Sequence, residues 1–184
     1  MPERYRAITW QNLATLAGPE GLGALGLVLD EHGQPLRTHA AAHELYRRMQ
    51  GRRKTVLLGE TRAGKTIAAA AALRAELELG NDQAQWVHAC DLREPEAMGR
   101  ALAASFLVLD DVGYELDGKT GGWLATERAP IRDFLARWES RSKARLIVTT
   151  AFGFDEMASD ERGYGGAAAM RVYEGAETIR FRRT

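Results

Sequence analysis

An eight-residue pattern in the first half of the chain has the spacing of a phosphate-binding loop. It begins at Gly59, ends in Lys65 and Thr66, and follows the rule G-x-x-x-x-G-K-[ST]. The apolar run 55–58 precedes it and the alanine-rich stretch 67–79 follows it, so the order is strand, loop and helix. This order lets backbone N–H groups and a helix N-terminus point at a phosphate. The predicted nucleotide-binding residues are Gly59, Glu60, Thr61, Arg62, Ala63, Gly64, Lys65, Thr66 and Ile67.

Two neighbouring acids supply the other half of the predicted site. Asp110 and Asp111 directly follow the apolar run 106–109. Lys65 is predicted to place its cation on the outer phosphates of a nucleotide, while Thr66 and Asp110 are the predicted ligands of Mg2+. Asp111 is predicted to orient or deprotonate the attacking water. The predicted cofactors are therefore ATP and Mg2+.

The elements that must position these residues alternate between strands and helices. After the loop, strand-length apolar runs fall at 85–89, 105–109, 145–149 and 177–181. Helical patterns lie between them, and the clearest is the i, i+3, i+4, i+7 stripe of residues 131–138. This alternation predicts an α/β fold with a parallel sheet between helices. Because the run 177–181 alternates polar and apolar residues, we expect it to be an edge strand.

The length of chain between the loop and the acids indicates the order of the strands in the sheet. A complete strand and helix separate them, which predicts the strand order 5-1-4-3-2 of ATPases that activate water. We therefore expect a three-layer P-loop NTPase fold with five parallel strands and no sizeable lid domain. At 184 residues the chain is long enough for one domain. We expect a lead-in segment and helix over 1–50 and a nucleotide-binding core over 51–184.

Composition limits the cellular setting and the kinds of partner. Lysine plus arginine and aspartate plus glutamate both number 25, so no global positive field points to nucleic acid. The single cysteine, Cys90, permits no internal disulfide. The N-terminus leads into no apolar core of signal length, and the apolar run 21–29 is far too short to span a bilayer. These features predict a cytoplasmic protein without a membrane partner.

The acid-bearing segment also carries a resemblance to a known family. Residues 107–114, with the run Asp-Asp-x-Gly-Tyr ending in Tyr114, are similar to the signature of the DnaC/IstB type of AAA+ ATPases. Residues 87–92, 134–138 and 146–150 support this resemblance, which extends over roughly residues 5–181. It implies an AAA+ type core that assembles into homo-oligomers.

The end of the chain resembles the part of that family that presents an arginine finger. Residues 169–172, followed by 179–181, match its helix and final strand. The resemblance implies that Arg171 reaches the γ-phosphate bound by a neighbouring subunit, with Arg162 as the nearest alternative. It also implies helicase loading or help to a transposase, in DNA replication or transposition. The implied partners are a replicative helicase or a transposase and single-stranded or double-stranded DNA.

Two departures from the family pattern bear on activity. Ala151 stands where the family has an asparagine sensor, so we expect that role at Thr150 and slow hydrolysis. Only residues 92–104 are available for the helical insertion that touches single-stranded DNA in such loaders. These departures leave open a nucleotide-switched binding module with little hydrolysis. A small-molecule or nucleoside kinase is a further alternative, which only the size of the chain favours.

Overall fold

A six-stranded sheet forms the centre of the computed structural model, which describes residues 1–3, 6–10, 27–28, 34, 38–113, 125–160 and 163–182. The spatial order of its strands is β1-β6-β2-β5-β4-β3. Their bounds are β1 Leu27–Val28, β2 Lys54–Gly59, β3 Ala84–His88, β4 Phe106–Val112, β5 Arg145–Thr150 and β6 Glu177–Arg182. All neighbouring strands pair in parallel except β1, which pairs antiparallel with β6.

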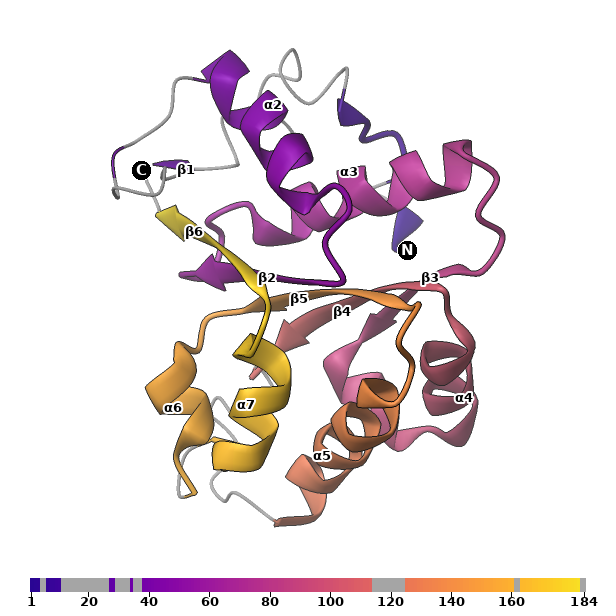
Figure 1. Cartoon of the computed structure of the whole chain (residues 1–184), viewed down its shortest axis with the longest axis vertical. Coiled ribbons are helices and arrows are strands. Elements are labelled where there is room, and N and C mark those ends of the chain that lie inside the picture. Colours follow the sequence, from indigo (N-terminus) through magenta and orange to yellow (C-terminus); the bar gives the residue numbers. More distant parts are fainter. Residues whose placement is uncertain are drawn as a thin grey trace.

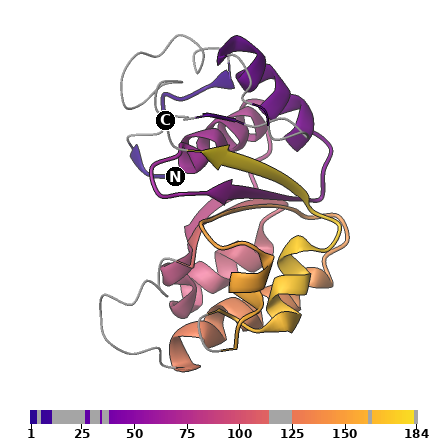
Figure 2. The same cartoon turned by 90° about the vertical axis from the view of Figure 1, so that its left-hand side faces the viewer.

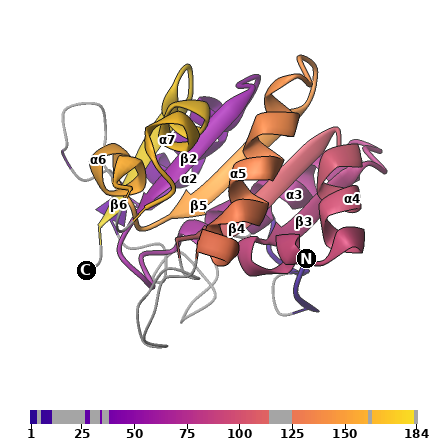
Figure 3. The same ribbon diagram turned by 90° about the horizontal axis from the view of Figure 1, so that it is seen from below.

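Helices cover both faces of this sheet, so the molecule has three layers (Figures 1 and 2). On one face lie α2 (Thr38–Met49) and α3 (Lys65–Glu78). The other face is covered by α4 (Pro95–Ala103), α5 (Ala125–Glu139), α6 (Phe154–Ala158) and α7 (Gly166–Tyr173). The short 3-10 helix η3 (Ala89–Arg93) connects β3 to α4. Figure 3 shows α7, α5 and α4 side by side across the second face.

The alternation of side chains along each strand divides the buried residues into two cores. In β4, Phe106 and Val108 pack with the helices α2 and α3, whereas Leu107 and Leu109 pack with the opposite helices. Every one of these four side chains is at most 1% exposed. Because successive strand residues point to opposite faces, a strand that is apolar throughout needs a cover on both sides. This explains why β4 reads as a continuous apolar run.

The five strands predicted from the apolar runs are all present, and their order is confirmed. Without β1, the order β6-β2-β5-β4-β3 is the predicted 5-1-4-3-2. The prediction that the last strand is an edge is wrong, because Leu27 and Val28 pair with Arg182 and Phe181 of β6. A two-residue strand inside a glycine-rich segment carries no periodicity from which it could be predicted. Most of the lead-in over 1–37 lies outside the described residues.

The parallel arrangement brings the carboxyl ends of β2, β4 and β5 to one edge of the sheet. In register, Leu58 of β2 lies beside Thr150 of β5, and Val112 of β4 lies beside Thr150 on the other side. Ligands of open α/β sheets bind outside this edge. Among the described residues no helix has both the length and the apolar character that crossing a membrane requires.

Candidate nucleotide site

The loop after β2 is shaped by close backbone contacts. A Cβ atom added to Gly59 would lie 2.2 Å from the carbonyl oxygen of Phe181 on β6, so only glycine fits there. Gly64 precedes the first residue of α3 with a φ of 91°, a left-handed conformation that favours glycine. Arg62 adopts a φ of 67° although it carries a side chain, and that side chain is exposed. Within the loop between Gly59 and Gly64, Ala63 N donates a hydrogen bond to Glu60 O at 3.2 Å.

Lys65 is buried beneath this loop. It is 6% exposed, and its Nζ donates hydrogen bonds to the carbonyl oxygens of Gly59 and Glu60, both at 2.7 Å. Burial lowers the pKa of the Lys65 ammonium, and the negative charges of Asp111 and Asp110 partly oppose that change. The lysine therefore lies between the loop carbonyls and the two acids of β4.

Asp110 is held by two hydroxyl groups from different elements. Thr149 Oγ1 of β5 donates to Asp110 Oδ1 at 2.7 Å, and Thr66 Oγ1 of α3 donates to the same oxygen at 3.1 Å. The side chain is almost fully enclosed, and burial raises the pKa of Asp110 while the bond from Thr149 opposes the rise. Thr66 and Asp110 offer the oxygen ligands that suit a hard cation such as Mg2+. The two predicted metal ligands thus lie together.

Asp111 has an irregular backbone at the end of β4. Its φ is 57°, and the pairing of β4 with β5 shifts register between Leu109 and Val112. The amide of Asp111 donates to Thr149 Oγ1 at 2.8 Å. Its side chain is 43% exposed, and Oδ2 lies 3.4 Å from His88 Nε2. A left-handed conformation at a residue with a Cβ atom is strained, and such strain is concentrated at functional sites.

His88, at the end of β3, connects the acids to the next strand. Its hydrogen bond with Asp111 raises the pKa of the imidazole, and burial opposes that rise. The other ring nitrogen, Nδ1, lies 3.1 Å from Cys90 Sγ. Sequence reasoning did not select His88 or Thr149. The signal available was positional, since both lie at the carboxyl end of a strand beside the acid-bearing strand.

Thr150, the predicted sensor, faces away from this cluster. Its hydroxyl donates to Val112 O at 2.7 Å and accepts a hydrogen bond from Phe152 N at 3.0 Å. The neighbouring Thr149 points to Asp110 instead, because adjacent strand residues face opposite sides. The role predicted for Thr150 stays a prediction. Tyr114 of the family-like signature lies outside the described residues.

Arg171 lies at the far end of the sheet from the loop. It belongs to the last turn of α7, where its Nη1 donates to Ala167 O at 3.3 Å. Its carbonyl oxygen accepts a hydrogen bond of 2.9 Å from Nζ of Lys54, the first residue of β2. The structure therefore separates Arg171 from the loop of its own chain, and its predicted contact with a neighbouring subunit stays a prediction. Arg162 lies outside the described residues.

Solved structures share the arrangement of the whole chain. The DnaC helicase loader is similar with a TM-score of 0.62 at 17% identity, over 98% of this chain and 99% of that one. DnaA from Aquifex aeolicus bound to AMPPCP is similar with a TM-score of 0.60 at 15% identity, over 95% of this chain. At these identities the similarity shows a shared fold, a three-layer α/β arrangement with the predicted strand order.

These similarities differ in extent. The chain spans half the length of the DnaA chain and nearly all of the DnaC chain. No protein-family model matches the sequence, and no curated protein matches it either. The similarity therefore lies in the fold, which in this chain places the loop after β2 and the acids of β4 at one edge of the sheet.

Proposed function

We propose that the protein is a Mg2+-dependent ATPase whose site is formed by the loop 59–66 and the end of β4. The observation that carries this proposal is the hydrogen bond between Thr66 of the loop helix and Asp110 of β4, at 3.1 Å. It joins the phosphate-binding half of the site to the acidic half. Thr66 and Asp110 would hold Mg2+, which supplies charge neutralisation between the outer phosphates.

The residues around the cation have complementary roles in this proposal. Lys65 would exchange its bonds with Gly59 O and Glu60 O for bonds with phosphate oxygens, because an ammonium favours anionic acceptors. Asp111, which is partly exposed beside the buried Asp110, would orient and deprotonate the attacking water. Arg171 of another copy would complete the site across a homo-oligomer interface.

Turnover and binding test this assignment separately. We expect Asp111→Asn to retain ATP binding and to stop phosphate release, because the amide cannot accept the proton of the water. Asp82→Asn is the matched control, since Asp82 is exposed in the turn before β3, at the opposite edge of the sheet. Full turnover in Asp111→Asn would contradict the proposed role, and an equal loss in Asp82→Asn would indicate a non-specific effect.

The cellular role that we propose is helicase loading or help to a transposase, in DNA replication or transposition. The similarity to the DnaC helicase loader over nearly the full length of both chains supports it. A pull-down with immobilised Asp111→Asn protein and ATP should capture a replicative helicase or a transposase. Capture that persists after Lys65→Ala would show that nucleotide plays no part in partner binding.

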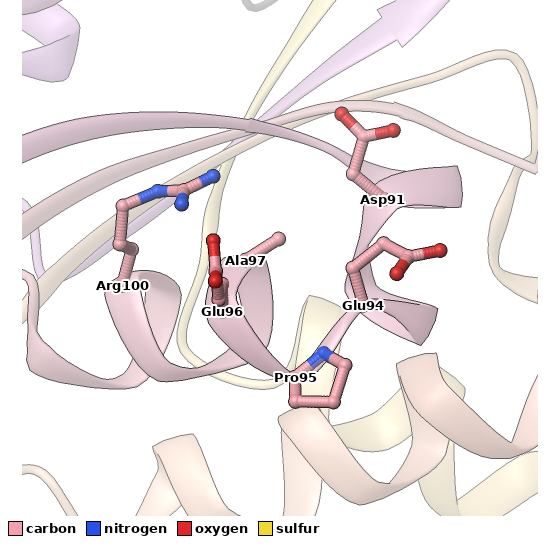
Figure 4. Close-up of a pocket in the computed structure, with 6 residues that line it drawn as sticks. All are labelled: Asp91, Glu94, Pro95, Glu96, Ala97 and Arg100. Carbon is pink, nitrogen blue, oxygen red and sulfur yellow. The ribbon is translucent and has the colours of Figure 1, made fainter.

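The charge of the surface around α4 disfavours DNA binding at this position. A pocket of about 550 Å3 is lined there by Asp91, Glu94, Pro95, Glu96, Ala97 and Arg100. Figure 4 shows Glu96 and Arg100 projecting from the same side of α4. Asp91 comes from η3, and Glu94 lies between η3 and α4. Three acids and one base around the opening repel phosphates at short range. We therefore propose that any DNA contact lies away from this helix.

A nucleotide-switched module with little hydrolysis is the second candidate function. The hydroxyl of Thr150 is already engaged by Val112 O and Phe152 N, so it does not face the loop. A site without a polar sensor beside the γ-phosphate would bind ATP and turn it over slowly. Steady-state phosphate release with and without single-stranded DNA separates the two candidates, because DNA-stimulated turnover excludes a switch that does not hydrolyse.

A further inference from the structure

Three metal-binding side chains meet at the carboxyl ends of β3 and β4. One ligand atom from each of His88, Asp110 and Asp111 lies within 4.8 Å of the other two. We propose that these residues bind a divalent transition-metal ion of the Zn2+, Co2+ or Mn2+ class. This site goes beyond the Mg2+ position proposed on Thr66 and Asp110, although it shares Asp110 with it.

Strand pairing explains two of the three ligands. His88 of β3 and Asp110 of β4 are register partners in the parallel sheet, so their side chains project to the same face. In a regular strand the next residue, Asp111, would point to the opposite face. Its φ of 57° interrupts the strand, and its carboxylate comes to 3.4 Å from His88 Nε2. The strained backbone thus completes the three-residue cluster.

The surroundings of the imidazole resemble the outer shell of a metal centre. His88 Nδ1 lies 3.1 Å from Cys90 Sγ, which leaves Nε2 directed at Asp111. Histidines that bind metals are usually oriented by a second partner on the other ring nitrogen. Asp110 is likewise oriented, because Thr149 and Thr66 both donate to its Oδ1. Both groups are therefore held in place before a metal binds.

The donor set identifies the class of ion. Mg2+ prefers oxygen ligands in a strict octahedral geometry, whereas one imidazole nitrogen with two carboxylates suits first-row transition metals. An ion here would engage both acids that the proposed ATPase needs. If the proposed function holds, the ion would therefore compete with Mg2+-nucleotide and inhibit the protein.

Cobalt titration of the nucleotide-free protein tests the site directly. We expect saturable visible d–d absorption in the wild type, which Zn2+ displaces. His88→Ala and His88→Gln should each weaken the apparent affinity for Co2+ at least about tenfold. The triple variant His32→Ala, His39→Ala, His43→Ala removes the other three of the four histidines and should retain the wild-type spectrum. Thermal unfolding of each variant verifies that it is folded.

Three results would overturn the proposal. They are an unchanged Co2+ affinity in both His88 variants, loss of binding in the triple variant, and a near-ultraviolet thiolate band that disappears in Cys90→Ser. The last result would place the metal on Cys90 instead of the two acids. Nucleotide binding is measured separately, and Zn2+ should weaken it in the wild type but not in His88→Gln. Failure of the ATPase proposal would therefore leave the Co2+ result intact.

Discussion

Two buried lysines, one near each end of β2, differ in the groups that they contact. Lys54 begins the strand and is 5% exposed, while Lys65 follows the loop at its other end and is 6% exposed. Burial lowers the pKa of both ammonium groups. Lys54 donates to Arg171 O and lies 3.8 Å from Glu139 Oε2, so it joins three elements. Lys65 contacts only the loop carbonyls among its described hydrogen-bond partners, beside two acids.

The two buried lysines therefore differ in role: one stabilises the fold, and the other is available to bind a ligand. The bond of Lys54 connects β2 to α7, far apart in the sequence, and therefore contributes to the fold. The bonds of Lys65 stay within six residues and can be exchanged for phosphate oxygens without moving another element. We expect the first lysine to matter for stability and the second for ligand binding.

Lys65→Ala is the substitution with the largest expected effect. It removes two charge-assisted bonds to phosphate, so we expect nucleotide affinity to fall by about 100-fold, or roughly 3 kcal/mol. Titration with a fluorescent ATP analogue measures the loss. The free energy of unfolding should hardly change, because a desolvated cation disappears together with two local bonds. A large loss of stability would contradict the expectation that only Lys54 stabilises the fold.

Lys54→Ala should show the opposite pattern. It removes the bond to Arg171 O and one of the two cations that pair with Glu139, at a cost of about 2 kcal/mol in the free energy of unfolding. Nucleotide affinity should change by less than about threefold, because the site lies at the other end of the strand. Urea unfolding and nucleotide titration on the same preparation test both statements. An affinity loss comparable to that of Lys65→Ala would contradict the division of roles.

Lys54 should also make the stability of the protein depend on pH. Because burial lowers the pKa of Lys54, the folded protein releases this proton at a lower pH than the unfolded chain does. Stability attributable to Lys54 should therefore rise as the pH increases from its folded pKa towards the ordinary value of about 10.4. The variant Lys54→Met has no ionisable side chain at this position and serves as the reference. The unfolding free energy of the wild type minus that of Lys54→Met should therefore increase over this alkaline range. If this difference stays constant, the pKa of Lys54 is not shifted in the folded protein.

Thr149→Val probes the acidic half of the site with a smaller expected effect. The valine leaves the Asp111 amide and Asp110 Oδ1 without the hydroxyl that joins them, at about 1–2 kcal/mol in stability. Phosphate release should fall about tenfold as Asp110 and Asp111 lose their fixed positions. Thr150→Val is the matched control, since its hydroxyl joins Val112 and Phe152 instead. A greater loss of turnover in Thr150→Val would favour the sensor role predicted for Thr150.

The residues that the sequence identified share a local signal. The loop from Gly59 to Thr66 and the acids after an apolar run are contiguous patterns, and the five parallel strands each have their own hydrophobic run. Thr149 and His88 belong to the site through strand register, which depends on pairing between segments distant in sequence. The left-handed φ of Asp111 was not predicted, because the acids lie within a strand-like run between Leu109 and Val112.

Arg62→Gly has the smallest expected effect. It distinguishes the effect of the strained backbone on stability from the effect of the side-chain charge on nucleotide affinity. Arg62 has a φ of 67°, and a glycine there should raise the free energy of unfolding by about 1 kcal/mol, or the melting temperature by roughly 2–4 °C. The same change removes an exposed cation beside the proposed phosphate position, so nucleotide affinity should fall about threefold. Arg62→Ala removes the charge but keeps the strained Cβ, and should lose affinity without gaining stability. If both variants keep full affinity, the loop binds phosphate through its backbone and Lys65 alone, and the contrast between the lysines becomes stronger.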